Sequence, residues 1–140
     1  MTARRRTKKN ANSRMGAAVV EFAVVAPVMI LLTMGMMEVG RMVMVRQLLV
    51  NASREGARLA VLPGTGSQEV QTLVQEELQA SSISGATVSV SPTLLASASA
   101  GTPVTVTVSV PSSAVSWVPN PLFNFSSILD ASTTMRRESQ

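Results

Sequence analysis

The feature that most constrains this chain is an apolar run from Met15 to Met37, whose 23 residues carry one charged side chain, Glu21. A helix needs roughly 20 predominantly apolar residues to cross the hydrocarbon core of a bilayer. The run is too long for the apolar region of a cleaved secretory signal peptide, and no A-x-A pattern follows it. A buried helix of a soluble protein is the other alternative, but it does not explain the basic cluster that precedes the run. We therefore expect a single membrane-spanning helix.

The net charge of the chain is concentrated at its N-terminus. Six basic residues and no acidic residue precede Gly16, whereas the residues from Ala17 onward hold six arginines and eight carboxylates. A basic tail alone is compatible with nucleic-acid binding, but no aromatic side chain is interleaved for base stacking. Positive residues beside an apolar run more commonly keep that end of the chain in the cytoplasm. We expect residues 1–16 to be a basic cytoplasmic leader with no nucleic-acid partner.

The helical pattern continues beyond the apolar run. No proline interrupts residues 38–62, and the first strong stop signal is Pro63-Gly64. Apolar or small residues recur at alternating spacings of three and four, as in a coiled coil; this seam is Met42, Val45, Leu49, Ala52, Gly56 and Leu59. We predict that residues 17–62 form one helix that extends out of the bilayer. Its seam is expected to pack against helices of other proteins, the alternative being the chain's own C-terminal domain.

Residues 63–140 are predicted to form a small domain outside the cytoplasmic membrane, in the periplasm or extracellular. Thr65 and Gln68 fit a capping box, and a helix of about residues 67–80 follows, with one apolar face formed by Val70, Leu73, Val74 and Leu78. The domain then changes to strands, so the fold class of the whole chain is α+β.

Valine alternates with serine or threonine in ATVSVSP and in PVTVTVSVP, which is the period of half-buried strands. A third alternation runs from Leu129 to Met135. These segments predict an antiparallel sheet of about three strands. Residues 112–120 are expected to be irregular.

Several classes of chemistry lack the residues that they need. The chain has no cysteine and no histidine, which removes thiolate chemistry, the commonest zinc ligands and the usual general base near neutral pH. Both lysines lie in the N-terminal tail, far from the serines of the domain, and Gly64-x-Gly66 lacks the lysine of a phosphate loop. We expect no cofactor, no metal and no enzymatic activity.

The start of the apolar run resembles the class III signal of type IV prepilins, in which a glycine and four mostly apolar residues precede a glutamate, here Gly16 and Glu21. Over about residues 16–61 the sequence resembles TadE-like proteins. The motifs that carry this resemblance are Glu21-Phe22, Ala26-Pro27, Glu38-x-Gly40-Arg41 and the block ASREGAR that begins at Ala52.

TadE-like proteins are minor pseudopilins of tight-adherence (Flp, type IVb) pilus systems. The resemblance implies a structural role in pilus assembly and cleavage by a prepilin peptidase between Gly16 and Ala17. It further implies that the partners are the lipid bilayer, that peptidase, other pilin or pseudopilin subunits and pilus assembly proteins. An unprocessed single-pass anchor that displays a β-rich binding or adhesin-like domain is the alternative function.

Cleavage would also explain the carboxylate in the apolar run. A new α-amine at Ala17 would lie four residues before Glu21, on the same helix face. Glu21 would then pair with this amine or with that of a neighbouring subunit, and the pairing would offset the desolvation of both charges. The alternative is a Glu21 that stays near the bilayer surface or is neutral.

Overall fold

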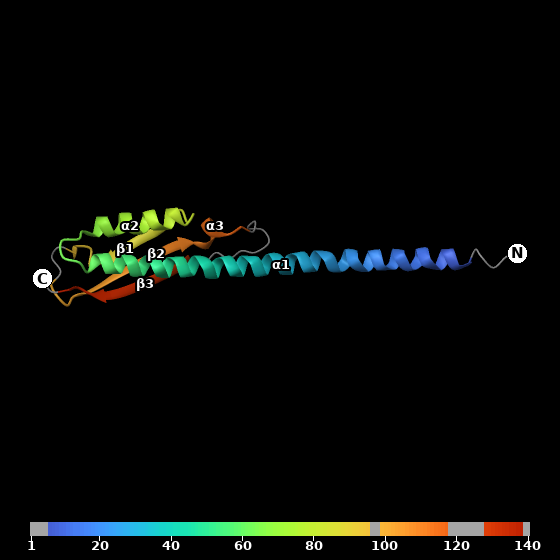
Figure 1. The fold of residues 1–140 in the computed structure, drawn as a ribbon, viewed down its shortest axis with the longest axis horizontal. Helices are drawn as coiled ribbons and strands as arrows, with labels where there is room; N and C mark the ends of the chain where they lie inside the picture. The colour runs from blue at the N-terminus through green and yellow to red at the C-terminus, as the bar shows by residue number, and fades with distance from the viewer. Residues whose placement is uncertain (1–5, 96–98, 118–127, 139–140) are drawn as a thin grey trace. The chain divides into compact units, whose positions relative to one another are not determined.

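The computed structural model describes residues 6–95, 99–117 and 128–138, with side chains described from Met15 onward. Figure 1 shows a long helix, a second helix beside its C-terminal part and a small sheet. The elements, in chain order, are α1 (Arg6–Ala60), α2 (Ser67–Ala80), β1 (Thr87–Ser91), β2 (Pro103–Pro111), α3 (Ser112–Val115) and β3 (Ile128–Arg136). The predicted α+β class, with a long N-terminal helix, a short helix and a three-stranded antiparallel sheet, is confirmed.

The chain divides into two compact units, Met1–Met37 and Glu38–Gln140. Helix α1 contributes to both, and it starts before the expected position at Ala17 and ends two residues before the expected position at residue 62. The second unit includes the C-terminal part of α1 because that part packs on α2 and the sheet. Whether Gly16 ends a leader is a question of processing and stays a prediction.

Helix α2 follows the predicted bounds of residues 67–80, because its apolar residues recur at helical spacing. Val70, Val74 and Leu78 are buried on one face of α2. The expected capping box is wrong, since the N-cap residue is Gly66 and no side chain caps the helix. Thr65 is instead buried, with 6% of its surface exposed.

The sheet has the order β1-β2-β3, and both pairings are antiparallel. Strand β2 is central, so its alternation decides which face of the sheet is apolar. Its inward side chains are fully buried, and β1 aligns two valines with them in the register Val88↔Val108 and Val90↔Val106. The buried residues of β2 are Val104, Val106, Val108 and Val110.

The outward face of the sheet is lined by short hydroxyl side chains. Thr105 of β2 and Thr134 of β3 lie side by side, with 2.8 Å between their Oγ1 atoms. Positions of the same parity on the other strands are serine or threonine as well, apart from Asp130, Ile128 and Arg136. Period two therefore separates a valine face from a hydroxyl face within one thin sheet.

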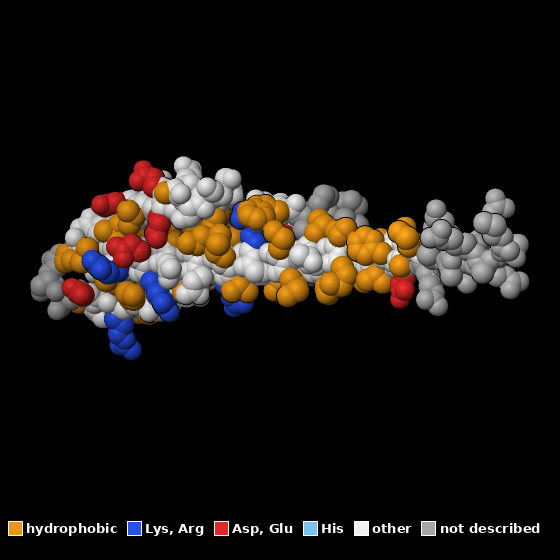
Figure 2. Space-filling model, turned by 45° about the vertical axis from the view of Figure 1, so that its right-hand side comes forward, with side chains coloured by type: hydrophobic (Ala, Val, Ile, Leu, Met, Phe, Trp, Pro, Cys, Tyr) orange, Lys and Arg blue, Asp and Glu red, His pale blue; other side chains and the backbone are white. Residues whose placement is uncertain are grey.

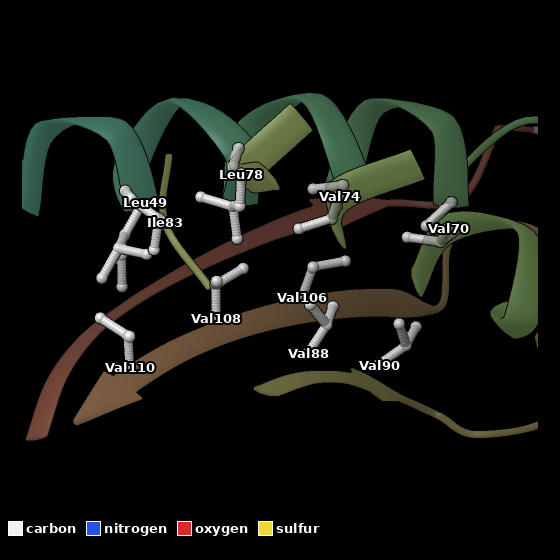
Figure 3. Packing of buried hydrophobic residues seen from close by; sticks show 14 of the residues in the cluster. Leu49, Val70, Val74, Leu78, Ile83, Val88, Val90, Val106, Val108 and Val110 are labelled. Carbon is white, nitrogen blue, oxygen red and sulfur yellow. The ribbon is translucent and has the colours of Figure 1, made fainter. Parts of the chain in front are cut away.

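The core lies between the valine face and two helices. Figure 3 shows Leu49 of α1 and Val70, Val74 and Leu78 of α2 directed at the valines of β1 and β2. All buried hydrophobic residues among those described are valine, leucine, isoleucine or alanine. Leu95, 1% exposed, joins this core from the segment between β1 and β2.

The predicted seam of α1 is part of this core. Val45, Leu49 and Ala52 are 0% exposed, Gly56 is buried, and Met42 and Leu59 at the two ends are half-buried. The seam therefore packs on the chain's own domain, which is the alternative that the spacing left open. These residues are therefore not accessible to the helix of another pilin. The expectation that the seam packs against helices of other proteins is wrong, because the chain's own domain covers it.

The segment after β2 differs from the expectation of an irregular chain. Residues Ser112–Val115 form the single helical turn α3, in which the Ser116 N–H donates to the Ser112 carbonyl. Ser116 and Trp117 follow without regular structure, and residues 118–120 lie outside the described residues. A single turn is too short to produce a periodic pattern of apolar residues, so it cannot be predicted from periodicity.

Gly56 allows the closest approach in the core. A Cβ at position 56 would lie 2.6 Å from Val74 Cγ2 and 3.3 Å from Val106 Cγ1, two fully buried atoms on β-branched side chains. We expect Gly56→Ala to lower the free energy of unfolding by about 1–2 kcal/mol, because overpacking outweighs the gain in helix propensity. Chemical unfolding of the detergent-solubilised chain, followed by Trp117 fluorescence, measures this change.

Gly40 supplies the matched control. It lies in the same helix, and a Cβ there would meet nothing within 4 Å. Gly40→Ala should therefore raise the free energy of unfolding by up to about 1 kcal/mol. Equal effects of the two substitutions would contradict the close packing at Gly56.

Candidate functional site

The predicted processing residues lie together on α1, in the first unit. Gly16, Ala17 and Glu21 are all exposed, and a Cβ at Gly16 would meet nothing within 4 Å. The structure is that of the uncut chain, in which the nitrogen of Ala17 is a peptide nitrogen. Cleavage and the pairing of Glu21 with an α-amine therefore stay predictions.

The side chains around Glu21 form an exposed apolar surface. Val19, Val20, Phe22 and Val24 are each between 65% and 71% exposed, and Figure 2 shows orange side chains along this helix. Met15–Ala60 includes a stretch that is long and apolar enough to cross a membrane, and none of that stretch is buried within the protein. A helix that is apolar on all sides is stable only with an apolar environment around it.

A second group of residues meets at the first turns of the second unit, and sequence reasoning did not find it. Its members are Glu38 and Arg41 of α1, Val115 of α3 and Trp117, which we call the Arg41 corner. The Arg41 guanidinium carbon lies 4.3 Å from the centroid of the Trp117 ring. Arg41 Nε donates a hydrogen bond to the Val115 carbonyl, and the backbone N–H of Trp117 donates to Glu38 Oε2 at 3.3 Å.

These contacts join residues that are far apart in the sequence. Glu38 and Arg41 are three apart on α1, so both side chains project from neighbouring positions on one side of the helix. The turn α3 directs the chain after β2 back to α1, and Trp117 then lies over Arg41. The available signals were the only tryptophan of an aromatic-poor chain and the Glu38-x-Gly40-Arg41 motif, but neither indicates its partner.

The corner combines a buried carboxylate with an exposed ring. Glu38 is 4% exposed, and its Oε1 has no hydrogen-bond partner among the residues that the structure describes. Trp117, in contrast, is 69% exposed. A buried carboxylate oxygen without a partner is costly, so the stability of the corner depends on the hydrogen bond that the backbone N–H of Trp117 donates to the other oxygen of Glu38.

The described residues contain no group of three or more histidine, cysteine, aspartate or glutamate side chains that could hold a metal ion. The Arg41 corner itself offers a cation, an exposed aromatic ring and one buried carboxylate.

Comparison with protein families gives one match, to TadE-like protein, over residues 16–58. The matched segment begins at the glycine of the predicted processing site. It includes Glu21, both α1 members of the Arg41 corner and the small-residue block around Gly56, whereas α2 and the sheet lie beyond it. Comparisons with curated proteins and with solved structures gave no match.

Replacement of Arg41 tests the corner. Arg41→Lys removes the Nε donor and the planar guanidinium that stacks on Trp117. We expect a loss of about 1–2 kcal/mol in the free energy of unfolding, from one hydrogen bond and one cation–π contact. Urea unfolding followed by Trp117 emission reports both the stability and the environment of the ring.

The control is Arg46→Lys, an exposed arginine on the same helix. Its replacement should change the free energy of unfolding by no more than about 0.5 kcal/mol. If Arg41→Lys had an effect as small as that of Arg46→Lys, the contacts of the corner would not contribute to stability.

Proposed function

Because residues 16–58 of this chain are a TadE-like segment, we propose that the protein is a minor pseudopilin that takes part in assembly of a type IVb, tight-adherence pilus. The observation that carries the proposal is the coincidence of two features in one helix. The segment that matches this pilus-related structural family is also the exposed apolar helix of the structure. The role is structural, and no catalytic step is assigned to the chain.

The proposed topology follows from charge. The basic residues before Gly16 stay in the cytoplasm, the apolar part of α1 crosses the cytoplasmic membrane once, and the α2–sheet domain lies on the outer side. The position of the cations supports this orientation: six basic residues and no acidic residue precede Gly16, directly before the apolar run.

Processing completes the proposal. A prepilin peptidase cuts between Gly16 and Ala17, and the new α-amine pairs with Glu21 of the same chain or of a neighbouring subunit. The accessibility of Gly16 and the exposure of Glu21 on the same helix support this step. The apolar surface of α1 then remains for contact with other pilin helices, because the seam is occupied by the chain's own core.

The mature N-terminus is the first measurement. In cells with an active prepilin peptidase, mass spectrometry should find a chain that begins at Ala17. A bulky residue at position 16, as in Gly16→Leu, should leave the leader attached, because the peptidase cuts after the glycine. An intact leader on the wild-type chain would favour the alternative function, an unprocessed anchor that displays the sheet domain.

Glu21 is tested by its effect on assembly. Glu21→Ala should abolish or strongly reduce pilus formation, whereas the chain should still insert into the membrane, since removal of a charge from an apolar segment favours insertion. Surface pili are counted by microscopy, and insertion is measured by membrane fractionation.

Glu55→Ala is the matched control, as Glu55 is an exposed carboxylate on α1 beyond the apolar run. It should leave both pilus number and insertion unchanged. Normal piliation in the Glu21→Ala strain would contradict a role for the ion pair in assembly.

A further inference from the structure

The exposed surface of α1 remains apolar after the end of the apolar run. Val39, Val43 and Met44 are 59%, 64% and 52% exposed, and they belong to the same compact unit as the sheet domain. Arg46 and Gln47 are the next exposed side chains, and with them the helix surface becomes polar. A soluble domain rarely exposes several such residues to water without a reason when they follow directly in the sequence on an apolar run.

Trp117 adds an aromatic ring beside Arg41, between Val39 and Val43 in position along α1. The sheet domain holds it over Arg41, where it is 69% exposed although it is the only tryptophan of the chain. An amphipathic ring beside an arginine is the pair of side chains that proteins place at the boundary between lipid and water. Arg41 and Arg46 are the first cations after the apolar run, and cations there attract anionic headgroups.

The distances agree with that boundary. The residues from Met15 to Met37 extend about 34 Å as a helix at ~1.5 Å per residue, close to the hydrocarbon thickness of roughly 30 Å. Arg41 is four residues beyond Met37, or roughly 6 Å along the axis. The headgroup layer on each side of a bilayer is about 5–8 Å thick, so Arg41 falls within it.

We propose that the Arg41 corner, together with Val39, Val43 and Met44, is a lipid-contact surface that seats the outer domain on the headgroup layer of the outer leaflet. This inference rests on the membrane span of the proposed function. Trp117 inserts its ring beside the acyl-chain boundary, while Arg41 and Arg46 lie at the lipid phosphates. The partner is a phospholipid surface, with anionic lipid preferred.

The fluorescence of the chain reports on this contact directly, because it contains one tryptophan and no tyrosine. The full chain is reconstituted into vesicles of phosphatidylcholine and phosphatidylglycerol. We expect bromine near the lipid headgroup to quench most of the Trp117 emission. Bromine at the ends of the acyl chains should quench it little. Aqueous iodide should quench it weakly.

A control tryptophan is placed on the same helix, farther from the membrane. The double variant Trp117→Phe/Arg58→Trp puts the ring at an exposed position 17 residues beyond Arg41, roughly 26 Å along α1. Its emission should be insensitive to brominated lipid and strongly quenched by iodide. Replacement of phosphatidylglycerol by phosphatidylcholine alone should weaken quenching of the wild-type chain by brominated lipid.

The outcomes separate this inference from the proposed function. Whether the chain floats with the vesicles after an alkaline wash tests the membrane span. A chain that does not float with them would overturn both the span and the lipid contact. If the chain floats but Trp117 is quenched by iodide and unaffected by brominated lipid, the lipid contact is wrong and the span stands. Protection from both quenchers, dependent on the ratio of protein to lipid, would identify a second copy of the chain as the occupant and would also overturn the lipid contact.

Discussion

The second unit depends on how closely α1 approaches α2 and the sheet. Gly56 lies against Val74 and Val106 at a distance that leaves no space for a Cβ. Alanines at positions 52, 57 and 60 continue the small surface on either side of it, and all three are fully buried. A helix with larger residues here would stand away from the sheet and leave voids, so the small residues of α1 and the branched residues of β2 are complementary parts of one packing solution.

This complementarity explains how a domain with so few large side chains holds a core. Its buried residues are short and mostly β-branched, which fits them to strands and costs little rotamer freedom on burial. A polar contact supplements the packing between α1 and β3, where Ser53 Oγ lies 2.8 Å from Thr133 Oγ1 and also donates to the Val50 carbonyl. The fully buried Ser53 therefore keeps its hydroxyl satisfied within an otherwise apolar interface.

The elements of the fold were largely predictable, because each has a strong period. The valines of β2 recur at every second residue, and the apolar residues of α2 recur at helical spacing. The predicted bounds of both elements therefore agree with the structure. The seam of α1 was detected for the same reason, but periodicity shows that a face is covered and not what covers it, so its partner was predicted incorrectly. The Thr65–Gln68 capping box failed because short polar motifs often occur without the geometry that they resemble.

The two candidate sites also differ in how far they could be predicted from the sequence. Gly16 and Glu21 were found because their spacing is local, within one helix. The Arg41 corner was missed because its contacts connect α1 to a residue 76 positions later, through a turn too short to leave a pattern. Tertiary contacts of this kind depend on the path of the whole chain, and one sequence provides no measure of that path.

The hydroxyl face of the sheet has a consequence of its own. Serine and threonine side chains are short, so a surface built from them has low relief and little rotational freedom to lose when something rests on it. Each hydroxyl both donates and accepts, so such a face matches a partner of either polarity by rotation alone. The side of the sheet opposite the valine core therefore adapts to contact at a small entropic cost, although it has almost no charge to attract a partner from a distance.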